Sequence, residues 1–320
     1  MTTIPLTHSP QPTMGRSWSS ILLSCGDKFM LSWLARGSLV AVLLAPVGCG
    51  KAPVAEKPTE NNSPKTSEVA RKVDTDPDRS PEAVPVKRDE LHRSFADATR
   101  SSDSVPENAQ RPPDTLLTGK PVFKVLEAVI KSWDTIRFVD DSGNKIRYVA
   151  HLHTDEGVVE VALFPEQAPN HVRNFIALAQ AGYYDGLVFD RARLETVGDN
   201  GKLESLEGGC PEGKGDQGMG SIGYWLKDEL TDAKVMSHEE GVFGACRAED
   251  ADTAACRFYI CLSKAPFLDG NYTLFGKVTK GLDVARKIYT KPVLSEDSER
   301  EGARRPEKPV VVHKVTIVRS

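Results

Sequence analysis

Residues 51–115 form a segment that cannot build a hydrophobic core, and this restricts folding to other parts of the chain. The segment holds nine of the 21 prolines, no glycine, 11 basic and 13 acidic residues, and one aromatic residue, Phe95. Such a composition buries too little apolar surface to offset the loss of chain entropy, and its prolines keep it extended. We predict a disordered linker over residues 50–115 and a folded region over residues 116–320, which is long enough for a substantial core.

The linker follows the one strongly apolar, uncharged run of the chain, at residues 39–47. Nine residues is the length of a signal-peptide core and about half of what a membrane-spanning helix needs. Gly48 and Cys49 come next, which resembles a bacterial lipoprotein cleavage site. We interpret residues 1–49 as a signal segment, with translation starting at Met1 or Met30, and Cys49 as the lipidated first residue of the mature chain.

A lipid on Cys49 would hold the protein in the bacterial cell envelope, facing the periplasm. Gly50, rather than Asp, follows the cysteine, and by resemblance to lipoprotein sorting rules this favours the outer membrane. The linker would then act as a leash between the membrane and the folded region. The alternatives are a plain secreted protein, a protein held by an uncleaved signal anchor, or an apolar run that is a buried helix.

The charge balance excludes a general nucleic-acid binder. The chain has 41 basic and 45 acidic residues, a net charge of −4, and no run of Lys and Arg that could track phosphates. Its 39% hydrophobic and 27% charged residues, without long apolar runs, also exclude collagen, coiled-coil and polytopic membrane proteins. We expect a monomer.

Hydrophobic periodicity divides residues 116–320 into a helical start and a β-rich remainder. Apolar residues at helical spacing predict a helix over 121–133, with Pro121 at its start. The period then changes to two, and residues 136–139 and 146–149 flank a turn at 140–144, which predicts a hairpin. Further predicted elements are strands at 151–153 and 158–163, a helix over 168–181, and short strands beyond it.

Several segments of the β-rich part occur in the order found in one known family. They are Leu163-Phe-Pro-Glu-Gln-Ala-Pro169 with His171-Val-Arg-Asn-Phe175, Gly182 to Arg191, Leu206-Glu-Gly-Gly209, Gly220 to Glu229, Gly241-Val-Phe-Gly-Ala245, Phe258 to Lys264, Phe267-Leu-Asp-Gly270 and Leu274-Phe-Gly-Lys-Val278. Taken together, they resemble the cyclophilin family of peptidyl-prolyl cis-trans isomerases. The resemblance implies a mainly β domain over residues 154–320, a closed eight-stranded antiparallel barrel capped by two helices. Residues 116–153 would then be an added N-terminal helix and hairpin.

The resemblance implies isomerisation of X–Pro bonds in proline-containing peptides or unfolded exported proteins, without cofactor or metal. The barrier to this rotation is about 18–20 kcal/mol, and lowering it requires an apolar proline pocket and a donor for the prolyl nitrogen. Arg191 matches the family's catalytic arginine, and a guanidinium is permanently charged and rigid. Tyr259, Phe267, Leu268 and Tyr272 would line the pocket, with Phe258 on the same strand. Read from the strand pattern alone, these aromatic residues are ordinary core residues.

Two departures from the family pattern leave a rival interpretation open. Arg257 stands where the family usually has a substrate-contacting glutamine, and Glu207 stands where another glutamine is usual. We expect both at the peptide site, and as an ion pair they could replace the two amides. The rival interpretation is a peptide-binding or scaffold module that keeps the barrel but has little or no catalytic activity.

The remaining motifs are a glycine-rich pattern, a pair of histidines and four cysteines. Gly218-Met-Gly-Ser-Ile-Gly223 fits a nucleotide-binding pattern, but it lacks a preceding strand and a following helix. His151 and His153 share one strand face, and no third metal ligand is evident nearby. Cys210, Cys246, Cys256 and Cys261 allow three full pairings. Cys246 and Cys256 flank the loop beside the expected site, so they are a candidate disulfide, and buried free thiols are the alternative.

Overall fold

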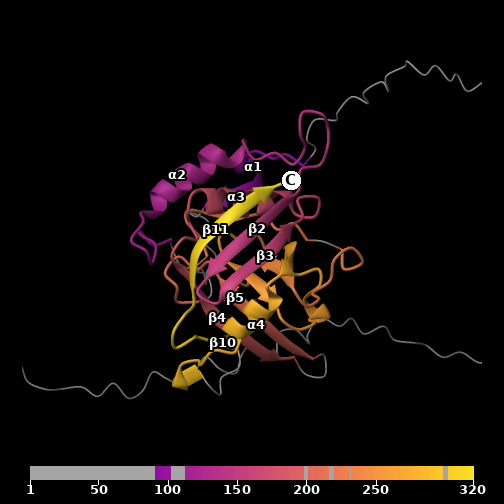
Figure 1. Ribbon diagram of the computed structural model, residues 1–320. Coiled ribbons are helices and arrows are strands. Elements are labelled where there is room, and N and C mark those ends of the chain that lie inside the picture. Colours follow the sequence, from indigo (N-terminus) through magenta and orange to yellow (C-terminus); the bar gives the residue numbers. More distant parts are fainter. Residues whose placement is uncertain (1–90, 102–111, 198–200, 216–219, 231, 298–301) are drawn as a thin grey trace, which may run out of the picture. The chain divides into compact units, whose positions relative to one another are not determined.

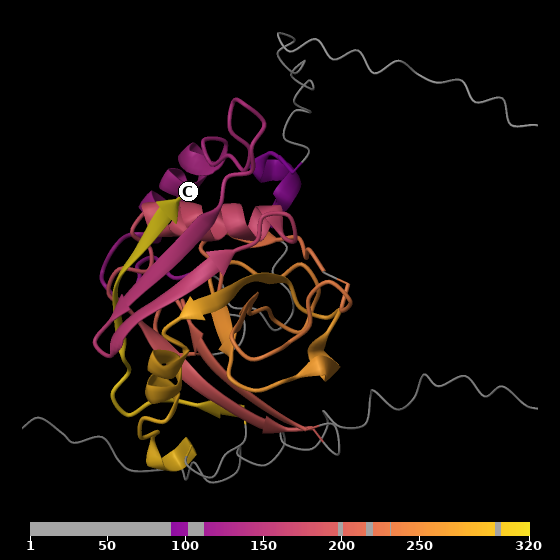
Figure 2. The ribbon, with the colours of Figure 1, turned by 45° about the vertical axis from the view of Figure 1, so that its right-hand side comes forward.

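The computed structural model describes residues 91–101, 112–197, 201–215, 220–230, 232–297 and 302–320. Eight strands form a closed antiparallel barrel (Figures 1 and 2), in the order β4-β11-β2-β3-β9-β7-β8-β5, and β5 pairs back to β4. Their bounds are β2 Tyr148–Thr154, β3 Gly157–Leu163, β4 Leu187–Thr196, β5 Lys202–Gly208, β7 Val242–Ala245, β8 Phe258–Cys261, β9 Leu274–Lys280 and β11 Val311–Arg319. The predicted closed barrel of eight antiparallel strands is confirmed.

Two helices pack on the barrel, as predicted. Helix α3, Pro169–Gln180, lies over one end and packs against β9 and β11, whereas α4, Leu282–Tyr289, packs against β3 and β5 (Figures 1 and 2). Phe175 of α3 inserts into an aromatic cluster in the barrel interior, with ring centroids 5.4 Å from Phe243 and 6.0 Å from Phe258. The described residues also include a short strand β10, Gly302–Arg304, paired to β4, and the 3-10 helices η2, Pro266–Leu268, and η3, Ser295–Asp297.

Helix α2, Val122–Trp133, confirms the helix predicted over residues 121–133. Its buried residues include Val125, Val129 and Trp133, and it packs against α3 (Figure 1). The guanidinium of Arg173, on α3, lies 5.8 Å from the Trp133 ring and 4.7 Å from the Phe138 ring, so a buried charge joins the two helices by cation–π contacts.

The predicted hairpin over residues 136–149 is present as a short antiparallel pair around its turn, where the Ile146 N–H donates to the Phe138 carbonyl at 2.9 Å. Asp140 Oδ1 accepts hydrogen bonds from the backbone N–H groups of Ser142 and Asn144, and one isolated bridge joins Val139 to Lys145. The following strand, β2, instead pairs with β3 and β11 as a wall of the barrel. The expected domain boundary at residue 154 is therefore wrong, because the barrel begins with β2 at Tyr148.

Part of the predicted disordered linker is folded. Residues 91–101 contain helix α1, Phe95–Ala98, and strand β1, Thr99–Ser101, which pairs with β6, Tyr224–Leu226. The Phe95 ring meets the rings of Trp133 and Tyr224 edge-on, at 5.2 and 5.0 Å. Phe95, the single aromatic residue of the segment, thus finds its partners in the folded region. The other expectations for residues 1–90, including the role of Cys49, lie outside the described residues.

Within the described ranges, no helix is both long and apolar enough to cross a membrane.

Candidate active site

The register of three neighbouring barrel strands brings Arg191, Glu207 and Tyr259 into one row. Strand β4 places Arg191 opposite Glu207 of β5, and β5 in turn places Glu207 opposite Tyr259 of β8. The register shifts between Phe189 and Arg191, which indicates a bulge in β4 at this point. A bulge re-aims side chains, so both Asp190 and Arg191 reach the same group of charges.

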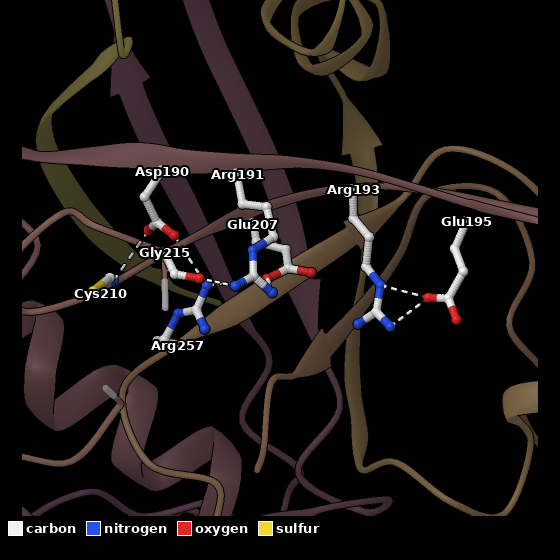
Figure 3. Close-up of polar contacts among 8 residues, drawn as sticks. All are labelled: Asp190, Arg191, Arg193, Glu195, Glu207, Cys210, Gly215 and Arg257. Atoms are coloured by element: carbon white, nitrogen blue, oxygen red, sulfur yellow. Dashed lines mark hydrogen bonds and ion pairs between the residues drawn. The ribbon is translucent and has the colours of Figure 1, made fainter. Parts of the chain in front are cut away.

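Four buried charged side chains, two basic and two acidic, meet around Arg191 and Glu207 of this row (Figure 3). Glu207 Oε2 lies 3.4 Å from Arg191 Nη1 and 3.0 Å from Arg257 Nη2. Arg257 Nη2 also donates to Asp190 Oδ2 at 2.9 Å, and Arg191 Nη2 donates to the carbonyl of Gly215. The ion pair between Glu207 and Arg257 that the sequence suggested is present. We name Asp190, Arg191, Glu207 and Arg257 the charge cluster.

Each cation of the charge cluster is held by a carboxylate, which balances the cost of burial. Burial lowers the pKa of Arg257, but the nearby charges of Asp190 and Glu207 outweigh this and raise it above its usual value. Burial raises the pKa of Asp190, and Arg257 opposes this increase only in part. The cluster therefore carries no net charge when all four groups are ionised, which is the arrangement in which buried charges are tolerated.

Arg191 keeps hydrogen-bonding capacity beyond these contacts. A guanidinium has five N–H donors. The side chain is 5% exposed, and its Nε has no hydrogen-bond partner among the described residues. Glu207 and the Gly215 carbonyl thus fix the orientation of the guanidinium through its two Nη atoms.

A second apolar cluster, separate from the main hydrophobic core, lies on the Tyr259 side of the site. Its members are Val242, Tyr259, Cys261 and Leu274, with Met236, Cys246 and Tyr272 packed against them. The rings of Tyr259 and Tyr272 meet edge-on at 6.1 Å. The expected pocket residues Phe267 and Leu268 are half-buried on η2, a few residues before Tyr272.

The structure corrects the expectation for Phe258. Successive residues of a strand point to opposite faces, so Phe258 and Tyr259 cannot both face the site. Phe258 is 1% exposed and packs against Phe243 in the barrel interior, with ring centroids 4.9 Å apart. It is a core residue.

The candidate disulfide between Cys246 and Cys256 is also corrected, because both thiols are free. The Cys246 N–H donates to the Arg257 carbonyl at 3.1 Å. Cys246 therefore lies across from Arg257, the residue that follows Cys256, and not across from Cys256 itself. Cys256 belongs to the main core, whereas Cys246 packs in the second apolar cluster. Burial raises the pKa of Cys261 to about 12, and Cys210 is a fourth free thiol.

The histidines singled out for a metal have other neighbours. His153 Nε2 lies 3.0 Å from Thr316 Oγ1, and the rings of His151 and His153 are 6.3 Å apart. In the parts of the chain that the structure describes, His, Cys, Asp and Glu residues do not gather in groups of three that could hold a metal ion.

Sequence reasoning missed two residues next to the second apolar cluster, His238 and Asp269. His238 Nδ1 lies 2.6 Å from Asp269 Oδ1, and His238 Nε2 lies 2.8 Å from the Tyr259 hydroxyl. Asp269 lies in the Phe267-to-Gly270 motif, but nothing in the sequence pairs it with a histidine 31 residues earlier. Only the fold brings the three side chains together.

Comparison with known proteins identifies the family. Residues 149–317 match the family model described as cyclophilin type peptidyl-prolyl cis-trans isomerase/CLD. The chain belongs to this family, and the match begins within β2, in agreement with the corrected boundary of the barrel. The activity of its class is peptidyl-prolyl cis-trans isomerisation.

Two sequence relatives, each named as a peptidyl-prolyl cis-trans isomerase, agree with this assignment. The chain is 38% identical to peptidyl-prolyl cis-trans isomerase B of Bacillus subtilis over 145 residues, which cover 45% of this chain and 92% of that protein. It is 34% identical to peptidyl-prolyl cis-trans isomerase CYP18-1 of Arabidopsis thaliana, over 44% of this chain and 84% of that protein. A crystal structure of a Cryptosporidium parvum cyclophilin type isomerase is similar at a TM-score of 0.45 and 22% identity, covering 54% of this chain and 98% of that one.

Proposed function

We propose that this cyclophilin-type isomerase assists the folding of exported proteins, with Arg191 as the donor that stabilises the twisted prolyl amide. One observation carries the role of Arg191: strand register aligns Arg191, Glu207 and Tyr259 across β4, β5 and β8. Glu207 lies between Arg191 and Tyr259 in this row, which supports a substrate held between a guanidinium donor and an aromatic surface. The exported substrates follow from the signal segment predicted over residues 1–49.

The chemistry needs no covalent step. As the C–N bond rotates, resonance is lost and the prolyl nitrogen gains a lone pair that can accept a hydrogen bond. Arg191 would donate to this nitrogen, while Tyr259, Tyr272, Phe267 and Leu268 would hold the proline ring. Glu207 would keep the guanidinium aimed, since its carboxylate lies 3.4 Å from Nη1.

The test is to replace Arg191 and to measure turnover and binding separately. A donor that acts only in the transition state contributes to the rate and not to ground-state affinity. Arg191→Ala should therefore lower kcat/KM for a proline-containing peptide on the order of 10²–10³-fold and change peptide affinity only a few-fold. Arg191→Lys should rescue poorly, because an ammonium lacks the planar fork.

Arg193→Ala is the matched control. Arg193 lies two residues further along the same strand and is held by Glu195 through its Nε at 2.9 Å. It removes one positive charge from β4 without touching Arg191, so kcat/KM should stay within a few-fold of the wild type. Equal losses of affinity and rate in Arg191→Ala would instead make Arg191 a simple anchor for the peptide.

A second candidate function is a peptide-binding module with little catalysis. The observation that favours it is the engagement of Arg191 by both Glu207 and the Gly215 carbonyl. A wild-type protein that binds proline-containing peptides without accelerating their isomerisation, in an exchange NMR experiment, would establish this function.

A further inference from the structure

A buried chain of hydrogen bonds lies behind the aromatic surface of the candidate site. Asp269 Oδ1 contacts His238 Nδ1 at 2.6 Å, and His238 Nε2 contacts the Tyr259 hydroxyl at 2.8 Å. His238 is 1% exposed and Tyr259 is 6% exposed. The chain joins three segments of the sequence, and neither His238 nor Asp269 takes part in the charge cluster.

The partners determine the direction of each hydrogen bond. Asp269 accepts three hydrogen bonds, from the Ser237 hydroxyl, the His238 backbone N–H and the His238 ring. Burial raises the pKa of Asp269, but these hydrogen bonds outweigh it and lower the pKa below its usual value, so the group is a carboxylate. The proton between the two side chains therefore resides on His238 Nδ1.

A neutral imidazole with its proton on Nδ1 has an acceptor at Nε2. Burial lowers the pKa of His238, and Asp269 offsets this only in part, which keeps the ring neutral at neutral pH. The Tyr259 hydroxyl must then donate to His238 Nε2. Because the hydroxyl proton is used in the hydrogen bond to His238, the side of Tyr259 that would face the proline presents only the aromatic ring.

The residues around Tyr259 hold its ring in the position that this hydrogen bond needs. The planes of its ring and of the His238 ring are nearly parallel, at 7°, with the ring centroids 6.1 Å apart. A Cβ on Gly244 would overlap the ring and hydroxyl of Tyr259, so the glycine makes room for them. Tyr272 closes the arrangement, with its ring edge-on to both His238 and Tyr259.

Asp269 connects the same chain to η2. It is the residue that ends η2, where its N–H donates to the Pro266 carbonyl at 3.1 Å. Phe267 and Leu268 precede it directly. Asp269 and His238 thus tie η2 to Tyr259 on β8, two segments that would form opposite parts of the proline pocket.

We propose that His238 is a positioning residue that, through Asp269 and Tyr259, fixes the aromatic wall of the proline pocket and thereby sets the affinity for proline-containing peptides. This inference rests on the proposed function, because it takes Tyr259 as part of the pocket. His238 touches no substrate, so its effect should appear in KM and in the peptide dissociation constant, with kcat preserved.

The experiment breaks the Tyr259–His238 hydrogen bond from each side. Tyr259→Phe removes only the hydroxyl, and His238→Asn keeps an amide that can reach Asp269 but not Tyr259. Each variant should raise KM and the peptide dissociation constant about fivefold, as expected for one net hydrogen bond, with kcat within about twofold. The double variant should be no worse than either single variant, because both remove the same contact. His238→Gln, whose longer side chain can reach Tyr259, should restore part of the affinity.

Tyr148→Phe is the matched control. It removes a hydroxyl that donates to the Arg137 carbonyl at 2.7 Å, on a strand that carries none of the expected pocket residues. It should leave KM unchanged. An unchanged KM in Tyr259→Phe, or additive effects in the double variant, would overturn the inference.

Two readouts separate this inference from the proposed function. The peptide dissociation constant, measured by titration calorimetry, tests the positioning role even if the wild type proves to have no turnover. Nitrogen-15 NMR of the His238 ring should show a protonated Nδ1 and an unprotonated Nε2, and the opposite tautomer would overturn the inference. Loss of activity in Arg191→Ala bears only on the proposed function.

Discussion

Loss of one partner should destabilise the protein more in the charge cluster than in an ion pair at the surface. Removing one partner of a buried ion pair leaves an uncompensated charge and costs about 3–5 kcal/mol. Glu207→Gln would leave two arginines with Asp190, and Arg257→Gln would leave two carboxylates with Arg191. The double variant restores equal charge, so its loss in the free energy of unfolding should be clearly smaller than the sum of the two single losses. Urea denaturation measures all three.

The pair Arg193 and Glu195 provides the control for this cycle. It lies on the same strand, but its side chains are 28% and 37% exposed. Neutralising Glu195 with Glu195→Gln should cost less than about 1 kcal/mol, because solvent screens the charge that remains. Strictly additive losses at Glu207 and Arg257 would show that their carboxylate and guanidinium do not depend on each other.

His238 predicts the direction in which stability changes with pH. Its pKa in the folded state is below the ordinary value of about 6.5 because burial disfavours the charged ring. Below about pH 6.5 the unfolded chain takes up a proton that the folded chain refuses, so the free energy of unfolding falls as pH falls from 7 toward the lowered pKa. His238→Asn should have a flatter dependence of Tm on pH between 7 and 5. If Tm of His238→Asn depends on pH as steeply as that of the wild type, other groups cause the pH dependence.

At the residue scale, sequence reasoning succeeded where a motif or a charge pair marks a position. It placed Arg191, Glu207 and Arg257 together, and they are in contact. It failed for Phe258, because an aromatic run on a strand does not reveal which alternate residue faces inward. It could not find His238 and Asp269, since their contact depends on the path of the chain between them.

Among the elements, α1 and β1 yield a prediction opposite to that from composition. A low apolar content predicted a disordered linker over residues 50–115, which would be dispensable for folding, yet Phe95 packs against Trp133 and Tyr224. Trp133 Nε1 also donates to the Arg93 carbonyl at 2.9 Å. Phe95→Ala should therefore lower the free energy of unfolding by about 2 kcal/mol, which is less than the roughly 3–5 kcal/mol for a fully buried aromatic residue because Phe95 is only half-buried.

Phe123→Ala on α2 is the matched control for this loss. Its ring is 58% exposed, so the substitution removes little buried area and should change stability by no more than about 0.5 kcal/mol. Thermal and urea unfolding of the two variants make the comparison. Equal stability of Phe95→Ala and the wild type would restore the view that this segment is dispensable.

The elements also show why some boundaries could be predicted and others could not. The helices α2 and α3 carry long periodic patterns and were placed within a residue or two. The apolar runs around residues 136–149 are short, and their alternation is the same whether they pair with each other or with distant strands. Strand β11, some 165 residues away in sequence, pairs with β2, and no local pattern could have indicated this partner.

At the scale of the whole molecule, lipidation of Cys49 stays a prediction. It follows from the apolar run over residues 39–47 and the Gly48-Cys49 pair that ends it. Cys49→Ser should abolish labelling by a radioactive or clickable fatty acid and move the protein from the membrane to the soluble fraction. Arg191→Ala serves as a control that should fractionate as the wild type does. Membrane association of Cys49→Ser equal to that of the wild type would contradict the prediction.

The pairing of β1 with β6 also has a mechanical consequence. If the chain is fixed upstream of residue 91, a tensile load on the domain reaches α1 and β1 before it reaches the barrel. Strands β1 and β6 are three residues long, whereas β2 and β3 of the barrel are seven. Under load the short β1–β6 pair would separate first, and residues 91–101 would extend. The strands that align Arg191 with Tyr259 would then keep their register while the domain is pulled.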